Sequence, residues 1–292
     1  MSAPTPRMAD TATAEVKTES AMRLVLRQTG AIAGKEFRDR VRNRWVWVIA
    51  TVFAGFALAI AYFGAAGEGQ VGFRGIDVTI ASLVSLVTYL IPLIALVLGF
   101  DAVVGERERG TLELLLALPI TRGEVLVGKF LGLAATLSVA TLLGFGLAGA
   151  VFVGAGGDAM FHYAGFVASA ILLGLVFLAI AVLLSVVASD RARASGYAVG
   201  TWFLFVIVFD LVLLGGLIAL GGSSTGEALP WLLLANPTDV FRILNVFSLE
   251  QVGALYGLAT VFPPALANPA VLGGVMAGWI AAPLALAYWR FK

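Results

Sequence analysis

Residues 123–129 read Gly-Glu-Val-Leu-Val-Gly-Lys, which is the G-x-x-x-x-G-K spacing of a nucleotide phosphate loop. In such a loop, backbone N–H groups surround the phosphates, the lysine binds their β and γ oxygens, and the next Ser or Thr binds magnesium. Phe130 stands in place of that hydroxyl. The spacing is meaningful only between a buried strand and a helix, whereas Lys129 opens an apolar run. We therefore expect no nucleotide site here.

Asp210 is the only acidic residue deep inside one of the long apolar runs of the chain. A carboxylate at the centre of a membrane helix costs about 2.5–3.5 kcal/mol on insertion scales, which favours contact with other helices or a wet cavity. One interpretation is a substrate or gating contact at a dimer interface, and the other is a hydrogen-bonded packing group. No second acidic residue or histidine accompanies Asp210 in these runs, so a catalytic residue is not expected.

Metal ligation has weak support in this sequence. Copper prefers Cys, Met and His ligands, but the chain has no Cys, one His and five Met. Met160 and His162, in the stretch MFHY, are the weak candidates for a transient copper contact. A lone histidine beside an aromatic residue is more often an ordinary surface residue. We expect no cofactor and no copper path built from this chain.

The elements that position these residues are membrane helices. The chain has 292 residues, of which 60% are hydrophobic and 13% charged, against about 45–50% and about 25% in soluble domains. The net charge of +1 argues against a nucleic-acid partner. The absence of cysteine excludes disulfides, thiolate metal sites and cysteine nucleophiles. This composition indicates a multi-pass membrane protein.

Six apolar runs are long enough to cross a bilayer, which takes about 20 residues in a helix. We therefore predict an all-α integral membrane protein with six transmembrane helices, within a transmembrane domain over residues 45–292. The runs are residues 45–63, 80–100, 130–153, 166–187, 200–220 and 271–288.

Lys and Arg are divided very unevenly between the two sides of these spans. With a cytoplasmic N-terminus, every Lys and Arg except Arg74 and Arg242 falls on the cytoplasmic side. The positive-inside rule then places both termini in the cytoplasm, and we expect a multi-pass protein of the cell (inner) membrane.

The segments outside the spans are expected to be a tail, an interfacial helix and short outer helices. Residues 1–20 are polar and predicted to be disordered. Residues 21–44 end in a basic run before Trp45 and Trp47, which is typical of an amphipathic helix on the cytoplasmic leaflet. The two apolar pieces of residues 221–270 are each too short to cross, so we expect short helices in the outer interface. Two additional crossings are the alternative.

The connection between the second and third spans, residues 101–122, is far longer than the roughly 2–8 residues that join neighbouring helices. Its leucines lie at helical spacing behind a charged turn, and Thr121 with Glu124 forms a capping-box pattern. We predict a short amphipathic helix across the base of the spans, with its charged end facing the cytosol.

The stretches RNRWVW, GERERGTLELLLALPITRGEVLVGKF, WFLFVIVFDLVLL and NPTDVFRILN resemble the permease subunits of ABC-2 type (type V) transporters. More narrowly, they are similar to the membrane subunit of an ABC complex that supports copper-site assembly in nitrous-oxide reductase. The resemblance implies a non-catalytic permease that forms a homodimer in membrane lipid. It also implies two copies of an ABC ATPase subunit and a periplasmic subunit of copper-chaperone or repeat type.

The same resemblance assigns residues 101–122 as the coupling segment that inserts into the ATPase. The residues that it implies for this contact are Glu106, Arg107, Glu108, Arg109, Thr111, Leu112 and Leu115. An ABC-2 exporter of lipid, drug or polysaccharide is the alternative within the class. An ion-coupled secondary carrier that uses Asp210 is the alternative from another class.

Overall fold

The computed structural model describes residues 6–42, 44–63, 76–150, 157–219, 229–246 and 268–291, and the regular structure in these ranges is entirely helical. This confirms the all-α class. The helices are α1 (Pro6–Arg42), α2 (Trp45–Phe63), α3 (Ile76–Gly99), α4 (Val104–Glu108), α5 (Thr111–Leu116), α6 (Arg122–Gly149), α7 (Gly157–Val187), α8 (Arg191–Phe203), the π-helical turn η3 (Leu204–Val208), α9 (Phe209–Ala219), α10 (Leu229–Leu234), α11 (Pro237–Val246) and α13 (Pro269–Arg290).

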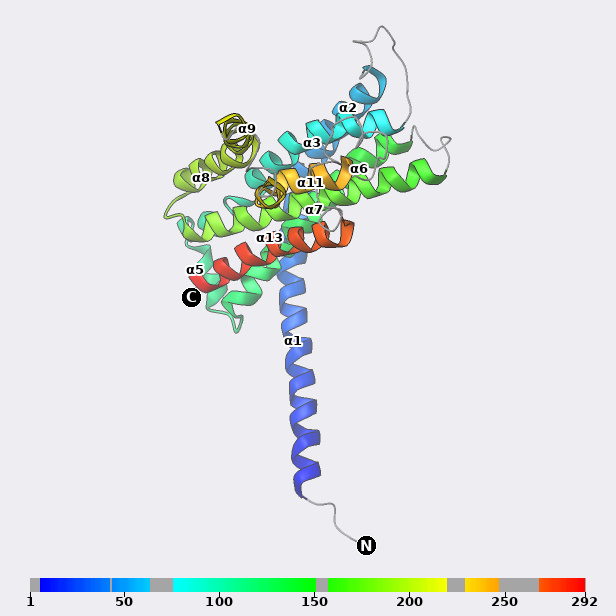
Figure 1. Cartoon of the computed structure of the whole chain (residues 1–292). Helices are drawn as coiled ribbons and strands as arrows, with labels where there is room; N and C mark the ends of the chain where they lie inside the picture. The colour runs from blue at the N-terminus through cyan, green and yellow to red at the C-terminus, as the bar shows by residue number, and fades with distance from the viewer. Residues whose placement is uncertain are drawn as a thin grey trace.

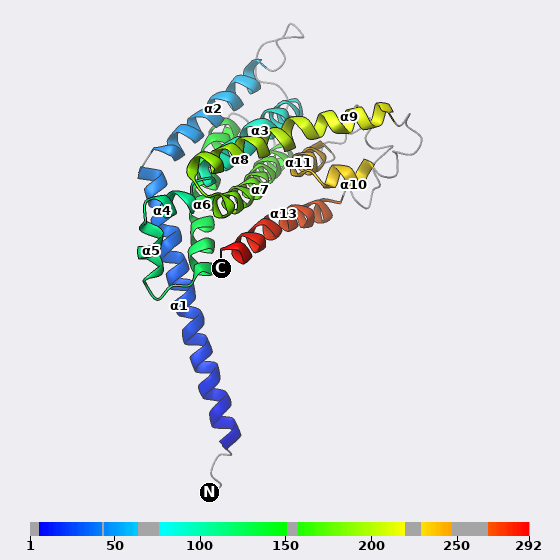
Figure 2. The same cartoon turned by 90° about the vertical axis from the view of Figure 1, so that its left-hand side faces the viewer.

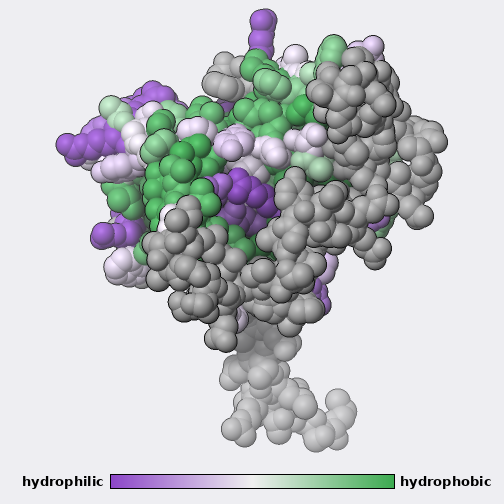
Figure 3. All heavy atoms as spheres, turned by 45° about the horizontal axis from the view of Figure 1, so that its top comes forward, coloured by the Kyte–Doolittle hydropathy of each residue, from purple (hydrophilic) through white to green (hydrophobic). Residues whose placement is uncertain are grey.

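Five helical segments in the described ranges are long and apolar enough to cross a membrane. They are built on α3, α6, α7, the continuous α8–η3–α9 segment and α13, and they match the last five predicted spans. The first predicted span is α2, which forms a pair with α1 that is bent by 64°. Counting this pair as one span gives six. In the view of Figure 3, broad hydrophobic patches lie over the described helices beside smaller hydrophilic areas, and such patches suit helices that face lipid.

The helices pack around α6 and α7 (Figure 1). Helix α7 lies between α3 and α13 and also contacts α6, while α1 and α2 follow one another along α6. Phenylalanine rings connect four of these elements through the core. Phe53 of α2 stacks on Phe145 of α6 at 5.1 Å, and Phe145 meets Phe166 of α7 edge-on at 5.5 Å. Phe166 in turn lies 6.3 Å from Phe241 of α11.

Three glycines of α6 allow its close contact with α1 and α2. A Cβ on Gly128 would lie 2.8 Å from Ile32, and one on Gly132 would lie 2.6 Å from the Ala33 carbonyl oxygen. Further along α6, a Cβ on Gly144 would lie 2.5 Å from Phe53. Small residues at such positions let helix backbones approach closely in membranes.

One end of the bundle gathers the ends of all five spans. The end of α3, the start of α6, the turn between α7 and α8, and the end of α13 meet there (Figure 2). Arg122 donates to the Phe291 carbonyl oxygen at 3.0 Å, which places the start of α6 beside the end of α13. The α4–α5 connection lies at this end, so the spans alternate in direction as the sequence predicts.

Two segments differ from the sequence expectation. Residues 6–20, expected to be disordered because they are polar, form the first turns of α1, which projects away from the bundle (Figures 1 and 2). Their Ala, Glu, Met and Lys residues have high helix propensity, and composition alone underestimates it. Whether residues 21–44 lie in the membrane interface stays a prediction.

The outer segment 221–270 contains α10 and α11, with residues 221–228 and 247–267 outside the described ranges. Asn236 accepts from the Thr238 N–H at 3.1 Å just before α11, which caps the start of this helix. In contrast to the predicted surface position, α11 packs against α3, α7 and α13, and Val240 and Phe241 are fully buried. Its apolar face therefore completes the core.

Candidate functional site

The α4–α5 connection is two short helices instead of the single amphipathic helix that the sequence predicts. They are separated by Gly110, whose φ of 70° lies in the left-handed region that favours glycine. Thr121 accepts from the Glu124 N–H, and the Glu124 carboxylate accepts from the Thr121 N–H at 2.6 Å, so the predicted capping box at the start of α6 is present. The chain therefore changes direction at Gly110 and again at Thr121.

Helix α4 is fixed to the turn between α7 and α8. The Ser185 hydroxyl accepts from the N–H groups of Val103 and Val104 at 2.9 and 3.0 Å, which caps α4 from a neighbouring helix. The Arg107 guanidinium donates to the carbonyl oxygens of Ala188 and Val186 at 3.0 and 3.2 Å. These contacts satisfy backbone groups at both helix ends, so α4 and the end of α7 form one rigid unit.

The next residue of the segment, Glu108, extends this attachment to α8. Its carboxylate accepts from the Arg191 N–H at 2.7 Å, at the start of α8. A carboxylate at a helix N-terminus is favoured by the helix dipole.

Glu106 points into the protein, where it meets Lys129 of α6. The Lys129 ammonium lies 2.8 Å from Glu106 and 3.3 Å from Glu36 of α1. The Lys129 side chain is only 3% exposed, so both contacts are largely screened from water. This arrangement differs from the expected charged end of the segment that faces outward. Lys129, which the sequence places at the edge of a span, is an interior group that connects three helices.

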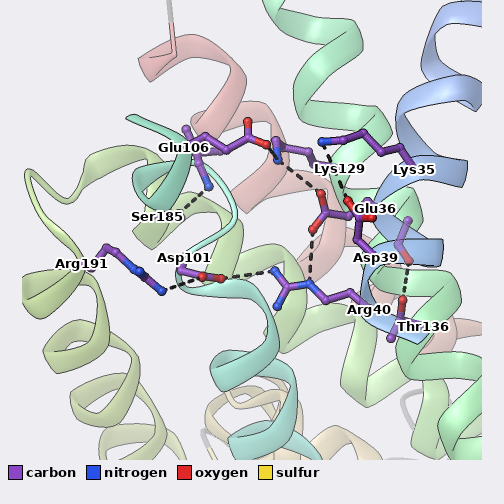
Figure 4. Close-up of polar contacts among 12 residues, drawn as sticks. Lys35, Glu36, Asp39, Arg40, Asp101, Glu106, Lys129, Thr136, Ser185 and Arg191 are labelled. Carbon is purple, nitrogen blue, oxygen red and sulfur yellow. Dashed lines mark hydrogen bonds and ion pairs between the residues drawn. The ribbon is translucent and has the colours of Figure 1, made fainter. Parts of the chain in front are cut away.

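Ion pairs continue from Glu36 across the bundle end (Figure 4). Arg40 pairs with Glu36 and with Asp101, each at 3.3 Å, and Arg191 pairs with Asp101 at 3.1 Å. The result is an alternating chain of three acidic and three basic side chains, which we call the ion-pair chain. Its members are Glu106, Lys129, Glu36, Arg40, Asp101 and Arg191.

The outward face of the connection includes four of the seven residues assigned from the sequence and further residues that were not assigned. Leu112 is buried and Leu115 is half-buried, whereas Leu114 is 72% exposed. Glu113 and Leu118 are also exposed. Among the residues assigned from the sequence, those with exposed side chains are Arg107, Glu108, Arg109 and Thr111. Leu114 was missed because the helical pattern groups leucines without fixing which side faces the bundle.

The phosphate-loop spacing has a structural explanation within α6. Gly128 and Lys129 lie in the interior of this helix, where the glycine contacts α1 and the lysine binds two carboxylates. The stretch therefore lacks the loop geometry that would surround a phosphate.

Asp210 has a partner that sequence reasoning missed. Its carboxylate lies 2.9 Å from Arg242 of α11, which also pairs with Asp239 at 2.9 Å. Because the helical segment begins at Arg191 and not at residue 200, Asp210 lies toward its far end instead of its middle. Of the two interpretations left open, the polar packing group has direct support from this contact.

Met160 and His162 lie at the start of α7. Met160 lines an apolar pocket of about 480 Å³ together with Tyr163, and the His162 ring lies edge-on to Phe161 at 6.2 Å. Within the described ranges, no three His, Cys, Asp or Glu residues are grouped closely enough to hold a metal ion.

Comparisons with known proteins agree on one family. Residues 30–292 match the family described as ABC-2 family transporter protein. The chain is 47% identical over 272 residues to a probable ABC transporter permease protein NosY of Stutzerimonas stutzeri, which covers 91% of this chain and 99% of the relative. It is 46% identical over 275 residues to the probable NosY permease of Pseudomonas aeruginosa, covering 89% and 96%.

Proposed function

The chain belongs to the ABC-2 transporter family, and we propose from this membership that it is the permease subunit whose movements are driven by ATP hydrolysis in a partner ATPase. The observation that carries the proposal is the α4–α5 connection. It exposes Leu114 at one end of the bundle while Glu106 and Arg107 attach it to α6 and α7. A partner bound to α5 therefore acts directly on the helix ends.

The ion-pair chain is the route by which we propose that this movement reaches α1 and α8. It joins the α4–α5 connection to α1, α3, α6 and α8 through contacts of 2.8 to 3.3 Å. ATP drives a conformational change only if the partner binds two states of the permease with different affinity. The largely buried pairs of Lys129 with Glu106 and Glu36 suit this role because a partial separation leaves a costly unpaired charge.

We propose that the protein lies in the inner membrane of the cell. We also propose that its α4–α5 end faces the cytoplasm. Arg107, Arg109, Arg122 and Arg191 lie at this end, and the positive-inside rule places such residues on the cytoplasmic side. The periplasmic end is then the one that carries α11.

A second copy of this chain completes the proposed permease. Only 11% of the apolar stretch of the α8–α9 span is buried, which is less than in the other four described spans, so this span has the most surface available for a second copy. In the proposed assembly the two copies bind two ATPase subunits and a periplasmic subunit of copper-chaperone or repeat type. The similarity to NosY permeases supports a role in copper-site assembly of nitrous-oxide reductase.

An ion-coupled carrier built on Asp210 is less well supported. A carboxylate that binds a transported proton or sodium ion must exchange it, whereas Asp210 is held by Arg242 at 2.9 Å. An ABC-2 exporter of lipid, drug or polysaccharide remains the alternative within the family.

Purification of the complex in mild detergent tests the proposal. We expect an ABC ATPase to co-purify with the chain in equal amount, and ATP hydrolysis to require that partner. A deletion strain should lose nitrous-oxide reductase activity and its copper centres. Hydrolysis of ATP by the isolated chain would contradict the permease role, and normal copper loading in the deletion strain would favour the exporter alternative.

A further inference from the structure

The ion-pair chain forms one wall of a cavity of about 670 Å³ that no part of the proposed coupling mechanism uses. The volume falls within the roughly 300–1,000 Å³ of small-molecule sites. The other wall is apolar and comes from α2 and α3, where its residues are Ile49, Leu93, Ile94, Val97 and Leu98. Val97 is 40% exposed, so the apolar wall continues from the cavity onto the exposed side of α3. A ligand for this cavity needs one charged end and one apolar end.

The charged wall has one spare acceptor and one spare cation. Glu106 Oε2 is buried and has no hydrogen-bond partner in the described part of the chain, although its other oxygen binds Lys129. Arg109 lines the cavity and forms no ion pair with any side chain that the structure describes. The remaining charges in the lining are paired with one another, the weakest pair being Lys35 with Asp39 at 3.9 Å. The wall therefore suits a ligand with both an N–H donor and an anion.

We propose that this cavity binds a phospholipid with a primary amine in its headgroup, namely phosphatidylethanolamine. On binding, the Glu106 side chain turns its unpaired oxygen toward the cavity to accept from the ammonium, the phosphate pairs with Arg109, and the acyl chains follow the apolar wall past Val97. A buried acceptor without a partner is costly, and the ammonium removes that cost. Phosphatidylcholine has no N–H to donate, and phosphatidylglycerol has no amine.

The lipid contacts the same Glu106 that pairs with Lys129, so its binding affects the ion-pair chain. Its location in the cytoplasmic leaflet rests on the orientation proposed above. The binding itself does not, because the isolated chain contains the whole cavity. Loss of ATPase coupling and loss of lipid binding are therefore separate outcomes.

Native mass spectrometry of the full chain in detergent tests the proposal. Purified protein is mixed with phosphatidylethanolamine, phosphatidylcholine or phosphatidylglycerol that carry the same oleoyl chains. We expect phosphatidylethanolamine to bind about tenfold more tightly than the other two. Equal retention of the three lipids would overturn the headgroup assignment.

Matched variants locate the site. Val97→Trp fills the apolar part of the cavity and should weaken phosphatidylethanolamine binding about tenfold, whereas Val127→Trp, at a 46% exposed position of α6 outside the cavity, should not. Arg109→Gln should weaken binding, and Arg38→Gln, at an exposed position outside the cavity, should not. If a variant and its control retained the same amount of phosphatidylethanolamine, the assignment of the site to this cavity would be wrong.

Two further arms identify the occupant. Free glycerophosphoethanolamine carries the same headgroup without acyl chains, so it should fail to displace the lipid at equal concentration. Displacement by it would overturn the role of the apolar wall. If Val97→Trp converts dimer to monomer in size-exclusion chromatography without changing lipid retention, a second copy of the chain covers this wall and the lipid assignment is wrong.

Discussion

Lys129 and Glu106 form a 2.8 Å ion pair that joins the long helix α6 to the short helix α4. Both side chains are largely buried, with exposed fractions of 3% and 13%. Because Glu36 of α1 lies 3.3 Å from the same ammonium, one cation balances two carboxylates from different elements. Displacement of α4 alone would leave a buried charge without its partner.

Replacement of this cation should strongly destabilise the chain. Lys129→Met removes the charge while preserving the volume of an apolar side chain, and it leaves Glu36 and Glu106 without their shared partner. Breaking a buried pair in this way costs about 3–5 kcal/mol, so we expect a clear drop in the thermal unfolding temperature of the detergent-purified protein.

The control for this variant is Lys35→Met in the same region. The Lys35 side chain is 64% exposed and pairs with Asp39 at 3.9 Å, so its loss should change stability little. The double variant Lys129→Met with Glu106→Gln should recover part of the loss, since Glu36 keeps its pair with Arg40 and the Glu106 charge, which Lys129 balances, is then absent. Equal unfolding temperatures for Lys129→Met and Lys35→Met would contradict the assigned role of Lys129.

The exposed side of α5 provides the test of docking. Leu114→Asp places a charge on a 72% exposed leucine and should leave folding intact while it reduces ATPase binding by about tenfold or more. Leu26→Asp is a control for general surface polarity, because Leu26 is 64% exposed on α1 and lies outside the α4–α5 connection. Co-purification of the ATPase gives the readout. Full retention of the ATPase by Leu114→Asp would remove α5 from the interface.

The spans were predictable because the bilayer imposes a length on every apolar run. The predicted span over residues 271–288 corresponds to α13, Pro269–Arg290. The starts were predicted too late where a helix begins with polar residues: α6 starts at Arg122, before the apolar run that begins at Phe130. Hydropathy detects the apolar part of a helix, whereas the capping box at Thr121 marks its true start.

The pairings of charged residues could not be predicted, because each depends on contacts between distant parts of the chain. Lys129 has the sequence features of a span boundary, and only its contacts with Glu36 and Glu106 show that it is buried. Asp210 likewise has no visible partner in its own span. Arg242 lies in a segment assigned to the outer surface, and the packing of α11 into the bundle brings the two together.

The Asp210 pair provides a further prediction. Arg242→Met leaves both Asp210 and Asp239 without their cation and should destabilise the chain by about 1–3 kcal/mol. Asp210→Asn should have a smaller effect, because Arg242 keeps Asp239, which is only 5% exposed. Thermal unfolding of the two variants distinguishes these outcomes.

The same Asp210→Asn variant separates the packing role from the carrier alternative. As a packing group, Asp210 is dispensable for ATP-driven function in the assembled complex. A carrier residue is not, and its neutralisation would abolish dependence on a proton or sodium gradient. Loss of all function in a correctly folded Asp210→Asn chain would therefore favour the carrier.

The turn between α7 and α8 should respond to acid. The N–H of Arg193 and the hydroxyl of Ser189 bind the Asp190 carboxylate and lower its pKa below the ordinary 3.8. A lowered pKa in the folded state contributes stability above pH 3.8, and this contribution is lost as the pH falls through the folded-state pKa. Asp190→Asn preserves a capping side chain without a titrating group.

Acid unfolding of the purified chain compares the two proteins. The stability difference between the wild type and Asp190→Asn should be constant above about pH 5 and should shrink as the pH falls below the ordinary Asp value of about 3.9. A difference that stays constant down to the acid transition would show that Asp190 does not contribute through its charge.

The glycines of α6 test whether its close contact with α1 depends on the absence of a side chain. At Gly132 an added Cβ would lie 2.6 Å from the Ala33 carbonyl oxygen and 2.6 Å from Glu36 Cβ, so α1 must move away from α6. Overpacking of this kind costs about 1–3 kcal/mol.

At Gly146 of the same helix a Cβ would meet nothing within 4 Å, and alanine gains about 0.5–1 kcal/mol over glycine inside a helix. We therefore expect Gly132→Ala to lower and Gly146→Ala to maintain or raise the unfolding temperature. A loss of stability in Gly132→Ala but not in Gly146→Ala would show that Gly132 serves the contact with α1, and equal unfolding temperatures for the two variants would refute it.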